Sequence, residues 1–218
     1  MKPAGHWTAW QKAIAKWPFW VWEKLADASK DDEKCELAAI DGTTMSRSNP
    51  SQHYLTRIDS DKRINRPIQQ VVLIDIKRRK FLSWKIRIRP KGEKCDVKYL
   101  FKHTIIKPET IIMDKGFDSE PLHAYLRANG VWSVAPTRKN CRKGSFRKQL
   151  RDCFDYALYW QRVIIESMFS AIKRLFGVHI RARSWRAQRA EIYNRFIAYN
   201  IGAKKNYFLQ SFKIRNIY

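Results

Sequence analysis

The chain has 218 residues, 44% of them hydrophobic, and its 44 Lys and Arg residues against 20 Asp and Glu residues give a formal net charge of +24. That hydrophobic content allows a packed core, while the positive charge far exceeds what solubility requires and favours a nucleic acid over an anionic membrane as partner. No apolar run is long enough to span a bilayer, and the four cysteines lack the C-x-x-C spacing of a zinc site, which predicts a protein of the reducing cytoplasm.

The first predicted elements are short helices. Apolar residues recur there at helical spacing: Trp7, Trp10, Ile14, Trp17 and Val21. Pro18 predicts that one helix stops and a second begins at this point, and a polar stretch over residues 28–34 follows. We therefore expect a small helical segment over residues 1–34 and a main domain over residues 35–218. The tryptophans are expected to form a helical core stripe rather than a stacking surface.

Apolar runs and turn signals then predict three strands, a helix, a strand, a helix and a final strand. The strands are expected at residues 36–41, 71–76, 82–88, 110–114 and 131–135, and the helices at 96–101 and 118–129. In the third strand apolar residues alternate with Lys85, Arg87 and Arg89, so one face of that strand is basic. Residues 45–70 are expected to be a loop across the mouth of a site. This is the ribonuclease H-like order, an α/β fold with a mixed five-stranded sheet flanked by helices.

A basic segment and two helices complete the chain. Residues 137–151 contain Lys and Arg but no acid, which predicts a mobile basic loop. A long helix should follow, with one charged face and, beside it, one apolar stripe that packs on the sheet. The charged face consists of Tyr159, Arg162, Glu166 and Lys173, and the stripe of Ile165, Met168, Ile172 and Leu175. A last helix is expected from about Trp185 to Ala203.

Three carboxylates are the candidate catalytic and metal-binding residues. Asp41 and Asp114 each end an apolar run that reads as a buried strand, and the longer Glu166 can reach them from the helix. Phosphodiester cleavage needs stabilisation of charge on the attacking and leaving oxygens, which two divalent cations supply. Hard oxygen ligands suit Mg²⁺ or Mn²⁺.

Other carboxylates are weaker candidates. Asp75 is expected on the solvent side of its strand, Asp59 and Asp61 in the loop, and Asp118 is expected to cap a helix.

Together these residues resemble the DDE transposases of bacterial and archaeal insertion sequences. Tyr159, Arg162, Glu166 and Lys173 match the signature Y-x-x-R-x-x-x-E-x-x-x-x-x-x-K of one subgroup. The blocks at residues 40–43 (Ile-Asp-Gly-Thr) and 113–119 (Met-Asp-Lys-Gly-Phe-Asp-Ser) resemble the first and second aspartate blocks of that family. The resemblance runs from about residue 36 to about residue 202.

The resemblance implies an activity and a set of partners. It implies metal-dependent cleavage at transposon ends, attack of the freed 3′-hydroxyl on target DNA, two Mg²⁺ or Mn²⁺ ions, a homodimer on DNA, and a place with the prokaryotic nucleoid. The expected DNA contacts are Tyr159, Arg162 and Lys173, the basic loop residues Arg138, Lys139, Arg142 and Lys143, and the later arginines Arg181, Arg183 and Arg186.

Alternatives remain open from the sequence. Arg162 and Lys173 can be read as surface ion-pair partners of Glu166, and Tyr159 as a core residue. Many members of the resembled family carry a longer helical DNA-binding domain before the first aspartate, so residues 1–34 are expected as its remnant. A ribonuclease H-like nuclease or resolvase that only hydrolyses, and an inactive basic DNA-binding fragment, are the rival functions.

Overall fold

The computed structural model describes residues 16–30, 34–47, 56–57, 66–89, 92–138 and 143–215, with side chains described as far as residue 203. The strands are β1 (Leu37–Arg47), β2 (Ile68–Asp75), β3 (Lys80–Arg87), β4 (Thr110–Met113), β5 (Trp132–Val134) and β6 (His179–Ile180). The helices are α2 (Phe19–Ala28), η1 (Glu93–Asp96), α4 (Val97–Lys102), η2 (Lys115–Phe117), α5 (Glu120–Ala128), α6 (Ser145–Asp152), α7 (Tyr156–Trp160), α8 (Val163–Phe176) and α9 (Trp185–Arg215).

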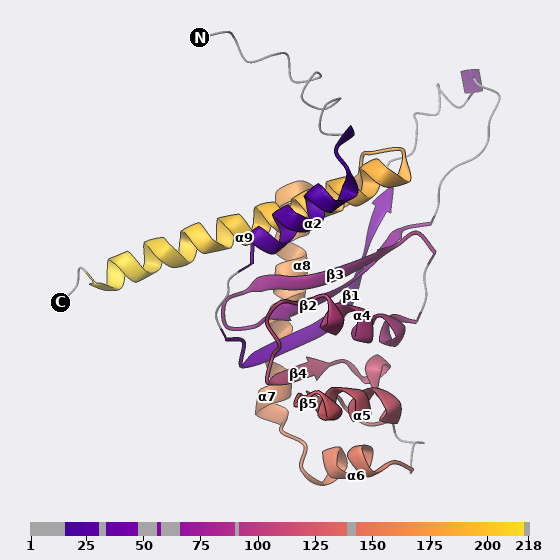
Figure 1. Cartoon of the computed structure of the whole chain (residues 1–218), viewed down its shortest axis with the longest axis vertical. Helices are drawn as coiled ribbons and strands as arrows, with labels where there is room; N and C mark the ends of the chain where they lie inside the picture. Colours follow the sequence, from indigo (N-terminus) through magenta and orange to yellow (C-terminus); the bar gives the residue numbers. More distant parts are fainter. Residues whose placement is uncertain are drawn as a thin grey trace.

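The sheet has the strand order β3-β2-β1-β4-β5 (Figure 1). β1 pairs antiparallel with β2, and β2 antiparallel with β3, whereas β1 with β4 and β4 with β5 are parallel. This is the ribonuclease H-like arrangement, and it confirms the predicted fold class and the order of the five expected strands. The two-residue β6, which the sequence analysis did not predict, pairs with the far end of β1 and makes the sheet six-stranded.

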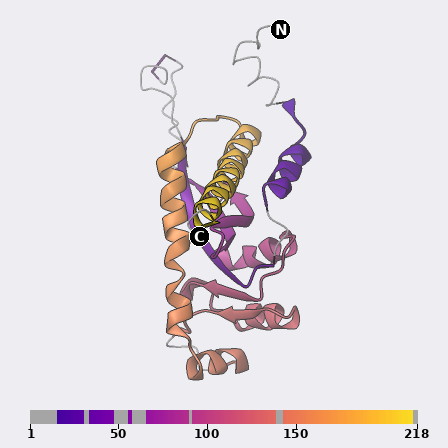
Figure 2. The same ribbon diagram turned by 90° about the vertical axis from the view of Figure 1, so that its left-hand side faces the viewer.

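Helices cover both faces of the sheet, as Figure 2 shows for α8 on one side and for α4 and α5 on the other. One buried cluster joins the sheet to α2, α8 and α9, and contains Val72, Trp84, Ile165 and Phe196. A second cluster lies on the opposite face and contains Ile40, Leu100 and Leu122. Because β2 lies between β3 and β1 and is covered on both faces, each of its residues is buried.

The N-terminal and C-terminal helices pack together on the sheet. α2 begins directly after Pro18, as expected, and buries Trp22 and Ala26 in the first cluster. The side chain of Asn200 on α9 accepts a hydrogen bond from Phe81 N and donates one to Phe81 O, each 2.9 Å long. Residues 1–15, with Trp7, Trp10 and Ile14, lie outside the described residues. In the described part of the chain, no helix combines the length and the apolar character that crossing a membrane requires.

The segment expected to be one long helix is two helices. Asp155 precedes α7 and caps it by accepting from Leu158 N, and a turn at residues 161 and 162 separates α7 from α8. Leu175 is exposed and does not join the apolar stripe. Phe176, which lies four residues after Ile172 on the same side of the helix, packs against the core instead. Part of the expected basic loop is helical, since α6 occupies Ser145–Asp152.

Two aspartates differ from their expected roles, and a third pairs with an arginine of β3. Asp75 is buried rather than solvent-facing and accepts from Arg78 N and Nη1. Asp118 is also buried and makes no helix cap; it accepts from Arg147 Nε instead. Asp96 precedes α4, but its carboxylate pairs with Arg87 rather than with the helix backbone. The loop aspartates Asp59 and Asp61 lie outside the described residues.

Candidate active site

Asp41 and Asp114 follow paired residues on adjacent parallel strands. Ile40 of β1 lies opposite Met113 of β4, and the residue after each of them is a carboxylate: Asp41 within β1 and Asp114 directly after β4. Asp41 is largely buried, and its Oδ1 accepts a 2.8 Å hydrogen bond from Gly42 N. Asp114 leaves the strand in an extended conformation and precedes η2. The parallel register therefore brings the two aspartates side by side.

Glu166 reaches this edge from the first turn of α8. Arg162, one turn earlier, donates from Nη1 to Asp41 Oδ2 at 2.8 Å and from Nη2 to Glu166 Oε1 at 2.7 Å. The guanidinium therefore bridges a strand carboxylate and a helix carboxylate. The Glu166 side chain is 55% exposed, against 18% for Asp41, so Glu166 lies at the solvent side of the group.

Tyr159, the first predicted member of the charged face, contacts the remaining carboxylate. Its hydroxyl on α7 lies 3.5 Å from Asp114 Oδ1, in the orientation of a weak hydrogen bond. Burial, the largest cause, raises the pKa of the Tyr159 phenol, which keeps the hydroxyl protonated as a donor. Tyr159 and Arg162 thus each contact one of the two strand aspartates, and Glu166 contacts Arg162.

The site also contains a carboxylate that the sequence analysis missed. Glu93, in η1 after β3, lies against the backbone of Gly42, and a Cβ placed on Gly42 would be 1.9 Å from Glu93 Oε1. Gln69 Nε2 donates to that same oxygen at 3.3 Å. Burial is the main cause that raises the pKa of Glu93, and the nearby charges of Asp41 and Asp114 raise it further. The only signal in the sequence for Glu93 as a site residue is that an acidic residue follows the basic third strand.

Negative charge is crowded at this edge. Burial is the largest cause that raises the pKa of Asp41, with smaller contributions from Asp114 and Glu166; the Gly42 amide and Arg162 act in the opposite direction. Among the described residues, no three His, Cys, Asp or Glu side chains are close enough together to hold a metal ion. The groups at this edge are carboxylates, whose oxygens are the ligand type that Mg²⁺ and Mn²⁺ prefer.

Lys173 and the predicted basic loop differ in their position and contacts. Lys173 is half-buried on α8, two turns beyond Glu166. Arg138 donates from its backbone N to Asp118 Oδ2 at 3.0 Å, which ties the start of the loop to η2 and α5. Lys143 is exposed at the end of that loop. Lys139 and Arg142 lie outside the described residues.

The later arginines lie around the start of α9. The side chains of Arg181 and Arg183 are exposed, and the backbone N of Arg181 donates to Glu191. Arg186 is exposed too, but its Nη2 donates to the backbone oxygens of residues 16 and 17 and so helps to hold the chain that enters α2. Part of the hydrogen-bonding capacity of Arg186 is therefore structural.

A comparison with protein families identifies the family of the chain. The family model described as Transposase DDE domain matches residues 36–201. Among solved structures, the piggyBac transposase synaptic complex with hairpin DNA is similar at a TM-score of 0.47 and 13% identity, covering 79% of this chain and 49% of that one. The chain thus spans about half the length of that solved chain. The search of curated proteins found no match.

Proposed function

The chain belongs to the transposase DDE domain family, and we propose that it cleaves DNA at the ends of a mobile element and joins the freed 3′-hydroxyl to target DNA. The observation that supports this most is the convergence of Asp41 and Glu166 on the Arg162 guanidinium, with Asp114 beside them on the adjacent strand. We assign Asp41, Asp114 and Glu166 as the catalytic carboxylates. The match to the Y-x-x-R-x-x-x-E-x-x-x-x-x-x-K subgroup stays a prediction.

Asp41, Asp114 and Glu166 would hold two Mg²⁺ or Mn²⁺ ions, with Glu93 as an additional acceptor at the same edge. When bound, such ions stabilise charge on the attacking and leaving oxygens of a phosphodiester. One of the two donor groups of Arg162 would then turn from a carboxylate to a phosphate oxygen. Phosphate, like carboxylate, accepts paired hydrogen bonds from a guanidinium. Tyr159 would position the strand beside Asp114 through its protonated hydroxyl.

DNA is the proposed partner, both as the element's ends and as the target. Lys173, the loop at residues 138–143 and the arginines near the start of α9 would contact its phosphates, which the net charge of +24 favours. We further propose a homodimer on DNA, because two ends must be paired, and a location with the prokaryotic nucleoid. Residues 35–218 would be the catalytic domain, with residues 1–34 as a separate N-terminal segment.

A strand-transfer assay tests the proposed reaction. The substrate is a labelled duplex that carries the inverted repeat flanking the protein's own coding sequence, with a supercoiled plasmid as target and Mn²⁺ as the metal. We expect cleavage that exposes a 3′-hydroxyl, followed by covalent joining of that end to the plasmid. Cleavage without joining would instead identify a nuclease that only hydrolyses, and DNA binding without cleavage would identify an inactive fragment.

A further inference from the structure

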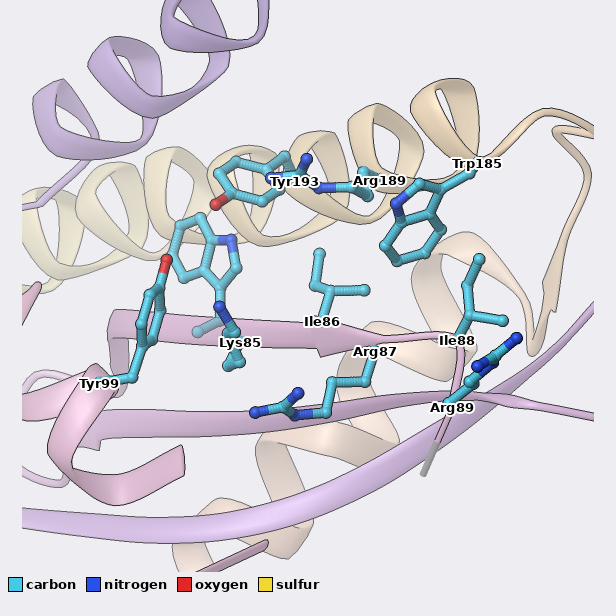
Figure 3. Close-up of a pocket in the computed structure, with 10 residues that line it drawn as sticks. Lys85, Ile86, Arg87, Ile88, Arg89, Tyr99, Trp185, Arg189 and Tyr193 are labelled. Carbon is cyan, nitrogen blue, oxygen red and sulfur yellow. The ribbon is translucent and has the colours of Figure 1, made fainter. Parts of the chain in front are cut away.

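The outer edge of β3 carries a pocket of about 370 Å³ that the proposed chemistry does not use. Figure 3 shows that it lies between α9 and the third strand, with Tyr99 of α4 at one end and Trp185 of α9 at the other. β3 is the terminal strand in the order β3-β2-β1-β4-β5, so among the described residues no strand pairs with its outer edge. The pocket therefore opens along a free sheet edge.

Positive charge surrounds this pocket. Lys85, Arg87, Arg89 and Arg189 all line it, and none of the other lining residues is acidic. Asp96 holds Arg87, with 2.8 Å between Arg87 Nε and Asp96 Oδ2, and among the described residues no salt bridge reaches the other three cations. An anion in the pocket would relieve the repulsion among these groups.

Ring contacts hold two of the cations in place. Lys85 Nζ lies 3.6 Å from the centre of the Tyr99 ring, and the Arg189 guanidinium lies 3.5 Å from the centre of the Phe19 ring. Stacking on a ring uses one face of a guanidinium and leaves its N–H groups directed outward. The pocket thus offers positioned donors rather than freely moving surface charges.

The positive charge of the pocket favours one of two possible occupants of the free sheet edge. An added strand, from a second copy or another protein, would pair with the backbone of β3, but cationic side chains on an edge strand oppose such pairing. A nucleic-acid strand has the opposite charge, and its bases can stack on an aromatic ring such as Trp185. The pocket volume also falls in the range of sites that hold one small-molecule unit.

The pocket is separate from the carboxylates but within reach of the same DNA. Asp41 lies opposite Val72 of β2, and Val72 lies opposite Trp84 of β3, which lines the pocket. Two strand spacings amount to roughly 10 Å between the backbones. One DNA molecule can therefore contact both places.

We propose that this pocket binds one nucleotide of a single-stranded DNA flank, with its phosphate held by Arg87, Arg89 and Arg189 and its base stacked on Trp185. The identity of that flank, a strand leading to the cleaved end, rests on the proposed function. The binding of single-stranded DNA does not, because the charge and the aromatic ring support it directly.

The test measures DNA binding as a function of salt, without cleavage. Fluorescence anisotropy in EDTA compares a blunt duplex with the same duplex carrying a single-stranded overhang of about six nucleotides, within the usual site sizes. Arg89→Gln with Arg189→Gln should weaken binding to the overhang probe and lower the magnitude of its log K against log salt slope by about two. The matched control, Lys102→Gln with Arg174→Gln, removes two exposed cations outside the pocket and should keep the wild-type slope.

Two further variants complete the design. Trp185→Leu should weaken binding of the overhang probe by about tenfold and leave the blunt duplex within about twofold. If circular dichroism shows that the Arg189 variant is unfolded, Arg89→Gln alone, which changes an exposed residue after the end of β3, should lower the slope by about one.

The outcomes separate this inference from the proposed function. An unchanged slope in the pocket variants, or an unchanged overhang preference in Trp185→Leu, would overturn the inference even if the wild type cleaves DNA. The predicted losses would support it even if the wild type never cleaves. Loss of self-association rather than DNA binding, measured by sedimentation, would assign the edge to a second copy and overturn the inference.

Discussion

Arg162 and Asp41 lie 121 residues apart in the chain, yet Arg162 Nη1 is 2.8 Å from Asp41 Oδ2. The same guanidinium reaches Glu166, so a single cation connects the sheet to α8 at the place where the carboxylates gather. A divalent ion and this guanidinium would satisfy the same oxygens. We therefore predict that Arg162 stabilises the metal-free site and competes with the metal.

Arg162→Gln should change metal affinity and activity in opposite directions. Removing the guanidinium frees Asp41 and Glu166, so Mn²⁺ affinity should rise by about threefold to tenfold, a gain of roughly 1 kcal/mol. DNA cleavage should fall because a phosphate donor is lost. Mn²⁺ electron paramagnetic resonance measures the first effect and single-turnover cleavage the second. Lower Mn²⁺ affinity in the variant would contradict the competition.

Gly42→Ala and Glu93→Ala should act through the same carboxylate. A Cβ at residue 42 displaces the Glu93 carboxylate, the far end of a flexible side chain, so unfolding free energy should change by less than about 1 kcal/mol. Because Glu93 is proposed as an additional acceptor at the site, each single variant should slow cleavage by about tenfold or more, and the double variant no further. Glu36→Gln, an exposed acid before β1, should keep the wild-type rate. Additive losses in the double variant would disprove a shared cause.

Buried His123 should make the fold sensitive to acid. Its Nδ1 lies 2.8 Å from Ser133 Oγ, and burial is the largest cause that lowers its pKa below the ordinary value of 6.5. As the pH falls below about 6.5, His123 is therefore protonated in the unfolded chain at a higher pH than in the folded chain. The free energy of unfolding should fall as pH decreases from about 6.5. His123→Asn should reduce this pH dependence in urea titrations.

Ser133→Ala is the control for that experiment. It removes the hydrogen bond to His123 but keeps the imidazole, so it should lower stability at every pH and retain the dependence on acid. An acid dependence that is the same in His123→Asn as in the wild type would assign it to other groups.

Asn200 should contribute strongly to stability. It is fully buried, and Asn200→Ala leaves both Phe81 N and Phe81 O without their side-chain partner, so the free energy of unfolding should fall by about 2 to 4 kcal/mol. Asn129→Ala, which removes an exposed hydrogen bond to Tyr125 O, should cost less than about 1 kcal/mol. Equal losses in urea titrations would contradict this role of Asn200.

The strand order and three members of the charged face could be predicted because their signals are local. Alternating or continuous apolar runs mark the strands, and the spacing of Tyr159, Arg162 and Glu166 keeps them on one side even though a turn divides α7 from α8. The turn itself escaped prediction because its residues have near-helical conformations and preserve the spacing.

The remaining features depend on contacts between distant segments. Glu93 enters the site only because η1 lies near enough for its side chain to reach Gly42, and Gly42 leaves the space that its carboxylate fills. Asp118 reads as a helix cap until α6 brings Arg147 to it. Neither contact leaves a periodic signal in the sequence.

Single-turnover cleavage of DNA carrying the element's own ends tests the central claim most directly. With Mn²⁺ and saturating DNA, Asp114→Asn should lose at least about a thousandfold in rate, since a metal ion supplies several kcal/mol of charge stabilisation. Its salt-sensitive DNA affinity should stay within about twofold of wild type, and the exposed control Asp152→Asn should cleave normally. Cleavage by Asp114→Asn at the wild-type rate would contradict the assignment of these carboxylates as the catalytic site.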